Sequence, residues 1–181
     1  SASLVGSEMC IRDRFMHLDG YMDVCDAVLS RRDLATRQRI LKDSHCGAFA
    51  VICMVLLAMG QWSLFLAAED VSWLALLLIP AATRACAGLA VLGLRPMGTS
   101  QYAAMGPARG GYGAALWVLL ALSVGLPLWL DGSFGPLAAA VGYGLAVWYG
   151  FRNLDGMSGD ISGFALTIGE LCGCGAAILW R

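Results

Sequence analysis

Charged residues are scarce in this chain: Asp, Glu, Lys and Arg make up 14% of its 181 residues. A soluble domain normally carries about 25%. Hydrophobic residues reach 59%, and the mean hydropathy is +0.69. Long apolar tracts dominate the chain after Cys46, and a bilayer crossing needs about 20 such residues. These features argue against a soluble domain and predict an all-α, polytopic integral membrane helical bundle.

Other features are also missing. No basic patch is interleaved with aromatic residues, so we expect no nucleic-acid partner. The seven cysteines lie mostly in apolar stretches, and Cys172 and Cys174 have no second pair or nearby His to complete a metal set. We therefore predict no disulfide framework. No internal repeat or heptad pattern is visible either.

The first fourteen residues contain no apolar segment, so we do not expect them to be a signal peptide. The run over residues 5–14 resembles translated sequencing-adapter sequence. We therefore expect residues 1–14 to be a non-native or disordered leader, and residues 15–181 to form a single membrane domain.

Five spans are expected from the apolar lengths, at about 46–67, 72–94, 113–130, 134–151 and 161–180. Glycines at 142, 144, 169, 173 and 175 suit close helix packing in lipid. Alternating crossings place residues 15–45, 95–112 and 152–160 on one side. That side receives most of the basic residues, namely Arg31, Arg32, Arg37, Arg39, Lys42, Arg95, Arg109 and Arg152. Because positive charge favours the cytoplasmic side, we expect a multi-pass protein of the bacterial inner membrane with this side in the cytoplasm.

Three aspartates, Asp19, Asp23 and Asp26, follow one another in a helical segment expected over residues 15–30. Helical residues turn by roughly 100°, so the three carboxylates fall within an arc of about 60°. Between Arg14 and Arg31 there is no Lys or Arg to neutralise them, and like charges on one face repel. The pattern favours a divalent cation such as Mg²⁺, with bound phosphate completing its shell. The alternative is a solvated acidic stripe on an interfacial helix.

Further polar residues are expected on the same side of the membrane as the three aspartates. Lys42 and Ser44 are candidates for holding phosphate oxygens, and Asp43 for joining the metal, although Lys42 also suits a membrane-interface anchor. For His17 three roles are left open, namely general base, orientation of a ligand and helix capping.

Two arginines and two acids lie in or beside later spans. Arg84 is expected at an apolar depth, where a charge is costly and marks a functional site by default. The alternatives are a span broken at Pro80, which lets Arg84 reach the interface, and a structural ion pair with Glu170. Arg95 is equally a phosphate partner or an anchor. Asp160 is the better ligand candidate of the two acids, since Glu170 lies about 15 Å deeper along the same helix. Gly159 allows backbone to approach phosphate closely.

The motifs together resemble the adenosylcobinamide-GDP ribazoletransferase, or cobalamin synthase, family. The resemblance rests on His17-Leu-Asp-Gly-x-x-Asp-x-x-Asp26, Lys42-Asp-Ser44 with Gly47, and Ser158-Gly-Asp-x-x-Gly163 with Glu170. Family members usually carry additional N-terminal sequence, so the chain is expected to be N-terminally truncated relative to them. Gly163 is followed by bulky Phe164, where a small residue is usual.

The resemblance implies a Mg²⁺-dependent transferase that joins adenosylcobinamide-GDP to α-ribazole or its 5′-phosphate and releases GMP. It implies metal binding by Asp19, Asp23, Asp26, Asp43 and Asp160. Substrate binding would fall to Lys42, Ser44, Arg84, Arg95 and Gly159, with Asp23, His17 and Lys42 as the catalytic candidates. A homo-oligomer is left open.

Three other functions can be compared with this transferase interpretation. A CDP-alcohol phosphotransferase requires Ala-Arg after its Asp-Gly core, which Asp19-Gly20 lacks. A small membrane transporter would place its ligands near the midplane, often with repeats. A catalytically inactive fragment of the transferase is the third.

Overall fold

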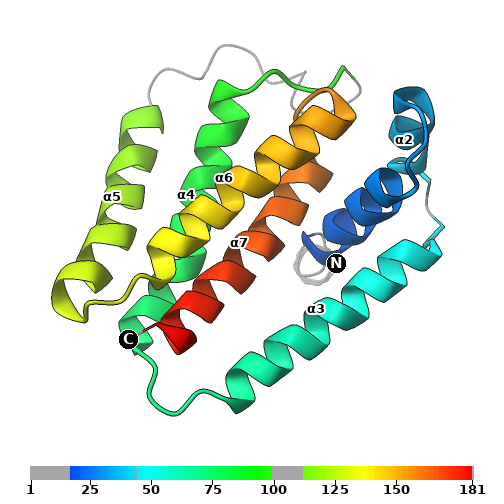
Figure 1. Ribbon diagram of the computed structural model, residues 1–181. Coiled ribbons are helices and arrows are strands. Elements are labelled where there is room, and N and C mark those ends of the chain that lie inside the picture. The colour runs from blue at the N-terminus through cyan, green and yellow to red at the C-terminus, as the bar shows by residue number, and fades with distance from the viewer. Residues whose placement is uncertain (1–16, 44, 99–111, 181) are drawn as a thin grey trace, which may run out of the picture.

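The protein is an all-helical bundle in a computed structural model that describes residues 17–43, 45–98 and 112–180. Its helices are the N-terminal helix over residues 17–29, α2 (Leu34–Ile40), α3 (Ala48–Leu66), α4 (Trp73–Gly93), α5 (Tyr112–Leu130), α6 (Gly135–Leu154) and α7 (Gly159–Leu179) (Figure 1). Within these ranges no strand forms, and the sole β-type pairing is an isolated bridge between Pro96 and Met157. The expected all-α class is confirmed. The leader boundary at residue 14 lies outside the described residues.

Four of the helices, α3, α4, α5 and α7, are long and apolar enough to cross a membrane, with mean hydropathies of 2.1, 1.9, 2.0 and 1.5. On α3, Leu56, Met59 and Trp62 are 63%, 62% and 69% exposed. Apolar surface of this extent is unfavourable in water but suits lipid. The chain is therefore a multi-pass membrane protein, as its sequence predicts.

The fifth expected span corresponds to α6, which is 20 residues long but less apolar than the other four. The buried residues on its inner face include Ala139, Gly142, Ala146 and Gly150. This face packs most extensively against α7 and also against α4. Small residues lower the hydropathy of α6 while they let it approach its neighbours closely.

Glycine makes the α6–α7 contact possible. A Cβ atom on Gly173 would lie 2.7 Å from the Cβ of Ala139, and one on Gly142 would lie 2.9 Å from the Cβ of Cys172. Gly144, by contrast, would meet no atom within 4 Å. The expected packing role thus holds for Gly142 and Gly173 but not for Gly144.

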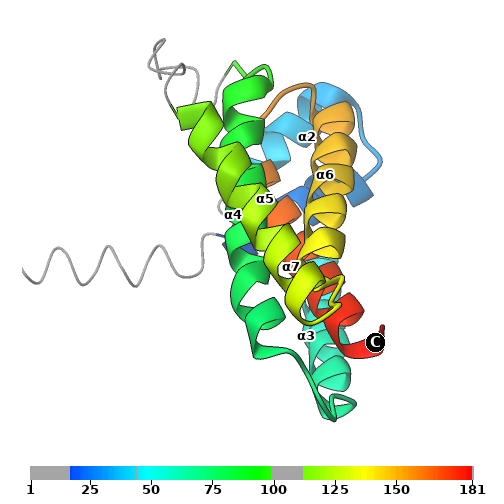
Figure 2. The same ribbon diagram turned by 90° about the vertical axis from the view of Figure 1, so that its left-hand side faces the viewer.

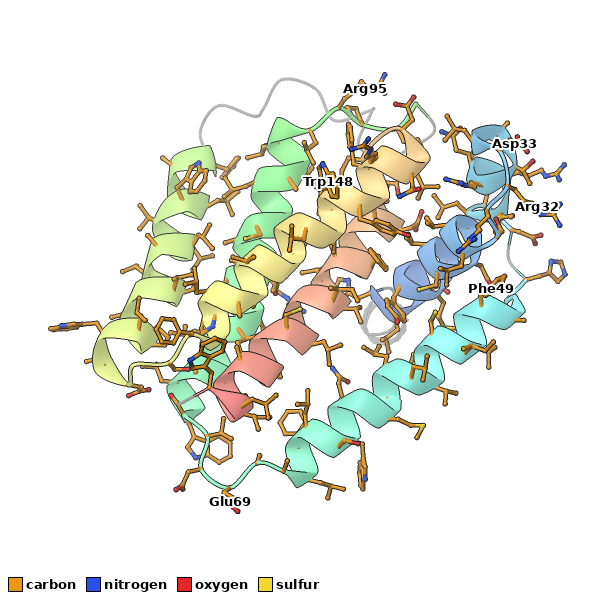
Figure 3. All side chains as sticks on the ribbon, viewed as in Figure 1. Arg32, Asp33, Phe49, Glu69, Arg95 and Trp148 are labelled. Atoms are coloured by element: carbon orange, nitrogen blue, oxygen red, sulfur yellow. The ribbon has the colours of Figure 1, made fainter. Side chains whose placement is uncertain are left out.

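The two ends of the bundle differ in chemistry. Figure 3 shows Arg32, Asp33 and Arg95 at one end and Glu69 at the other, as alternate crossings predict. Seen from the α5 side, α2 lies at the first end and the α3–α4 connection at the second (Figure 2). The end that carries α2 and Arg95, hereafter the polar end, is therefore where the predicted site residues are expected to gather.

Substitution of Gly173 by Ala tests this packing. We expect the change to destabilise the protein by about 1–3 kcal/mol, because the added methyl group overlaps Ala139 and helix backbone cannot yield cheaply. Thermal unfolding in detergent measures the effect. The matched control is Gly144→Ala, which adds the same methyl group to open space and removes a helix-interior glycine, so it should be neutral or stabilising by up to about 1 kcal/mol. Equal losses in both variants would contradict the packing role of Gly173.

Candidate functional site

The N-terminal helix lies between α3 and α7 (Figure 1). On one face, Tyr21 and Cys25 pack with Leu57 of α3, and the Tyr21 ring stacks on Phe164 of α7 with ring centroids 5.8 Å apart. On the other face, Val24 and neighbouring residues join a buried cluster with α6 and α7. The helix is thus embedded among the spans over most of its surface, which fixes where its aspartates lie.

Gly20 brings the N-terminal helix into contact with the backbone of α7. A Cβ atom at position 20 would lie 2.8 Å from both the Cα and the carbonyl oxygen of Asp160, so no other residue fits there without a shift. Asp160 lies in the first turn of α7, whose N-terminus is capped by the side chain of Ser158. Two segments about 140 residues apart in the chain therefore meet at the point where each carries a carboxylate.

Asp19, Asp23 and Asp160 form what we call the acidic cluster. Asp19 is exposed, whereas Asp23 and Asp160 are half-buried. Burial and the negative charges of Asp19, Asp160 and Asp26 raise the pKa of Asp23 from 3.8 to about 7. Each of these charges disfavours the ionised form of Asp23. The cluster therefore carries an unfavourable concentration of negative charge that a bound cation would relieve.

Asp26 has a different environment from the other two aspartates on its helix. It is 9% exposed, and its carboxylate accepts hydrogen bonds from the backbone N–H groups of Gly47, at 2.6 Å, and Ala50, at 3.0 Å. Both donors belong to the start of α3. The predicted metal ligand is thus bound to a helix N-terminus in this structure, and metal binding by Asp26 stays a prediction.

The Lys42 segment follows α2 at the polar end. Lys42 is exposed, and the Asp43 carboxylate lies 2.6 Å from Nδ1 of His45. Hydrogen bonds from His45 lower the pKa of Asp43. Ser44 lies outside the described residues, and His17 is half-buried at the first described position. The structure does not bring Asp43 into contact with the acidic cluster, so its metal role also stays a prediction.

The corner between α6 and α7, which carries Gly159 and Asp160, is held by the segment after α4. Arg95 donates hydrogen bonds to the side chain and the carbonyl oxygen of Asp155, at 2.6 and 3.2 Å. The backbones of Met97 and Met157 pair at 2.8 Å. From the other side, Gln38 of α2 donates to the carbonyl oxygen of Leu154 at 2.8 Å. Arg95 thus supports the corner, and sequence reasoning missed Asp155 and Gln38 because neither belongs to a recognisable motif.

Arg84 forms an ion pair with Glu170, joining α4 to α7. Thr83 lies beside the pair and donates to Glu170 at 3.3 Å. The side chains of Arg84 and Glu170 are 50% and 31% exposed. This is the structural ion pair that was one of the three sequence interpretations of Arg84.

No three His, Cys, Asp or Glu side chains in the described part of the chain are grouped closely enough to hold a metal ion together. A cavity of about 650 Å³ lies at the other end of the bundle, lined by residues such as Ser72, Asp131 and Trp180. The acidic cluster is separate from this cavity.

A bundle of apolar helices with its acidic cluster and several basic side chains at one end defines a multi-pass integral membrane protein. The chain belongs to the cobalamin-5-phosphate synthase family, whose pattern it matches over residues 2–178.

Among its relatives, the adenosylcobinamide-GDP ribazoletransferase of Clostridium perfringens strain 13 is 33% identical over 181 residues, which cover 95% of this chain and 71% of the relative. The enzymes of the same name from Clostridium botulinum strain Alaska E43 and Thiobacillus denitrificans are 34% and 38% identical, over 91% and 86% of this chain and 68% and 62% of their own lengths. No solved structure matches the chain.

The raised pKa of Asp23 predicts a pH dependence of stability. Because the folded-state pKa of about 7 exceeds the ordinary value of 3.8, folding favours the protonated carboxyl. Its stabilising contribution is full below the ordinary value and is lost as the pH rises through about 7. In detergent with a metal chelator, the melting temperature of the wild type should therefore fall, relative to that of Asp23→Asn, across this window. Parallel curves for the two proteins would contradict the assignment.

A double-mutant cycle tests the Arg84–Glu170 pair. Arg84→Met leaves Glu170 without its cation and should destabilise the protein by more than about 1 kcal/mol. Arg84→Met combined with Glu170→Met removes both charges and should recover most of that loss. Thermal unfolding of the four proteins gives the coupling, and additive losses would show that the pair makes no net contribution.

Proposed function

We propose that the chain catalyses the reaction named for its relatives, in which adenosylcobinamide-GDP is joined to α-ribazole or its 5′-phosphate and GMP is released during cobalamin biosynthesis. Family membership over residues 2–178 supports the assignment. The single structural observation that carries it is the acidic cluster, which two distant helices assemble at one end of a membrane bundle.

The cofactor proposed for this cluster is Mg²⁺. The fit rests on the donor set: carboxylate oxygens are the ligands that this ion prefers, usually completed by water and substrate phosphate. It rests also on charge, because the pKa of Asp23 is raised by burial and by the negative charges of neighbouring carboxylates. Asp19, Asp23 and Asp160 are the proposed ligands. Their carboxylates would have to move toward one another to hold one ion, because no three such side chains are grouped closely enough in the described residues. Asp43 would join them only by moving away from His45. When bound, the ion would neutralise the diphosphate and the charge that develops on departing GMP.

The chain's own residues would orient the two substrates. The reaction forms a bond from a ribose hydroxyl of α-ribazole to the phosphorus attached to cobinamide, and it breaks the bond from that phosphorus to the oxygen of GMP. Lys42 and Ser44 would hold phosphate oxygens, and Gly159 would let the diphosphate approach the start of α7. Asp23 or His17 would accept the hydroxyl proton.

The two arginines predicted to bind substrate have partners in the structure. Arg95 contacts Asp155 at the corner that also carries Gly159. Arg84 is paired with Glu170, so it would reach substrate only through its remaining N–H groups. Arg95 is therefore the better substrate-binding candidate of the two.

The proposed location is the bacterial inner membrane, with the site facing the cytoplasm. Arg31, Arg32, Arg39 and Lys42 are exposed at the polar end, whereas the opposite connections carry acidic residues such as Glu69. This asymmetry supports the orientation because basic loops remain on the cytoplasmic side.

Release of GMP from adenosylcobinamide-GDP and α-ribazole, by protein in proteoliposomes with Mg²⁺, tests the function. The wild type should release GMP, and Asp23→Asn should lower kcat by about 100-fold or more, since it removes charge at the proposed ion. Glu69→Gln, which alters an acid at the opposite end, is the control and should keep wild-type activity. Substrate flux across the vesicle membrane without any GMP would favour a transporter instead.

A further inference from the structure

The start of α3 lacks a cap of its own. The helices α2, α4 and α7 each begin at a residue whose side chain accepts the N–H three positions later, namely Asp33, Ser72 and Ser158. The corresponding residue of α3 is Gly47, which has no side chain to do so. The first N–H groups of a helix need an acceptor, and this need is strongest where water is scarce.

Asp26 meets this need from another helix. Its Oδ1 accepts the N–H of Ala50 at 3.0 Å, which is the N–H group that a Ser or Asp at position 47 would itself bind. Its Oδ2 accepts the N–H of Gly47 at 2.6 Å. The partial positive charge at the start of a helix further stabilises a carboxylate in this place.

The space around Gly47 fits the same interpretation. A Cβ atom on Gly47 would lie 2.6 Å from both carboxylate oxygens of Asp26. A side chain at position 47 and a carboxylate at position 26 therefore exclude each other. The glycine is needed because the cap arrives from outside the helix.

We propose that Asp26 is a positioning residue that caps α3 from the N-terminal helix, and that it is not a ligand of the catalytic ion. Asp26 lies on the same helical face as Asp23 and Asp19, one and two turns away. Its attachment to Gly47 therefore sets the rotation of the helix and holds these two carboxylates toward Asp160. It also fixes the end of the segment that carries Lys42 and Ser44. The part of the proposal that concerns the ion rests on the proposed function.

A swap of the cap between the two positions tests the proposal. Asp26→Ala removes the acceptor, and Gly47→Ser places a side chain against the carboxylate, so each single variant should lower the melting temperature. In the double variant Asp26→Ala/Gly47→Ser, the serine occupies the vacated space and caps Ala50 itself, so the melting temperature should recover. Gly60→Ser is the control, since it makes the same change in α3 where a Cβ would meet no atom within 4 Å.

Binding of Mn²⁺ alone to the same purified proteins separates positioning from ligation. We expect affinity to fall in Asp26→Ala and to return toward the wild-type value in the double variant, because serine restores the start of α3 but cannot replace a carboxylate ligand. Affinity that stays as low in the double variant as in Asp26→Ala, despite a recovered melting temperature, would show that Asp26 is a ligand and overturn the proposal.

The melting temperatures test the cap independently of metal binding. If they fall additively in the double variant, Asp26 does not cap α3 and the proposal is wrong. If the wild type binds no Mn²⁺, the proposed metal function fails, while the recovery or loss of the melting temperature still decides whether the cap exists.

Discussion

The backbone contact between Gly20 and Asp160 determines how the acidic cluster is assembled at the polar end. Because Gly20 has no side chain, the N-terminal helix approaches the backbone of α7 at the point where each helix carries a carboxylate. Burial and the resulting repulsion raise the pKa of Asp23, and packing elsewhere offsets this cost. Tyr21 stacked on Phe164 joins the two helices directly, while the Ser158 cap and the Arg95–Asp155 pair hold the start of α7 and the corner before it. Strain of this kind is expected where a ligand completes a site.

The membrane explains why the polar groups gather at one end. Hydrocarbon tolerates few charges, so the spans can act only as a support, and their contacts rely on small residues such as Gly142 and Gly173. The Arg84–Glu170 pair is the exception that the same rule permits, because each charge has its partner. An apolar bundle held by close α6–α7 packing thus provides a rigid base on which the corner at Gly159 can be placed accurately.

Sequence alone predicted the parts of this structure that depend on amino-acid composition and on the periodic spacing of residues along a helix. Apolar length located α3, α4, α5 and α7, and charge asymmetry identified the polar end. Helical spacing correctly placed Asp19 and Asp23 on one face. It did not reveal the close approach of Gly20 to α7, the support of the corner by Gln38 and Arg95, or the choice of Glu170 as the partner of Arg84 over substrate. These contacts join residues far apart in the chain, and their geometry depends on how the helices pack, which no local pattern encodes. A glycine inside an acidic helical motif was nevertheless a usable signal, since Gly costs helix stability unless close approach requires it.

The three aspartates of the N-terminal helix show how far spacing can specify a role. Asp19, Asp23 and Asp26 share one face and one residue type, so any argument from periodicity treats them alike. What divides them is the group that each meets on the neighbouring helix. Asp26 meets the free N–H groups at the start of α3, which satisfy its charge, whereas Asp23 meets other carboxylates, which do not. A carboxylate whose charge is already satisfied by hydrogen bonds gains less from a cation than one surrounded by like charge. The arrangement of partners, more than the motif itself, therefore separates the residue that builds the site from those that would bind its ion.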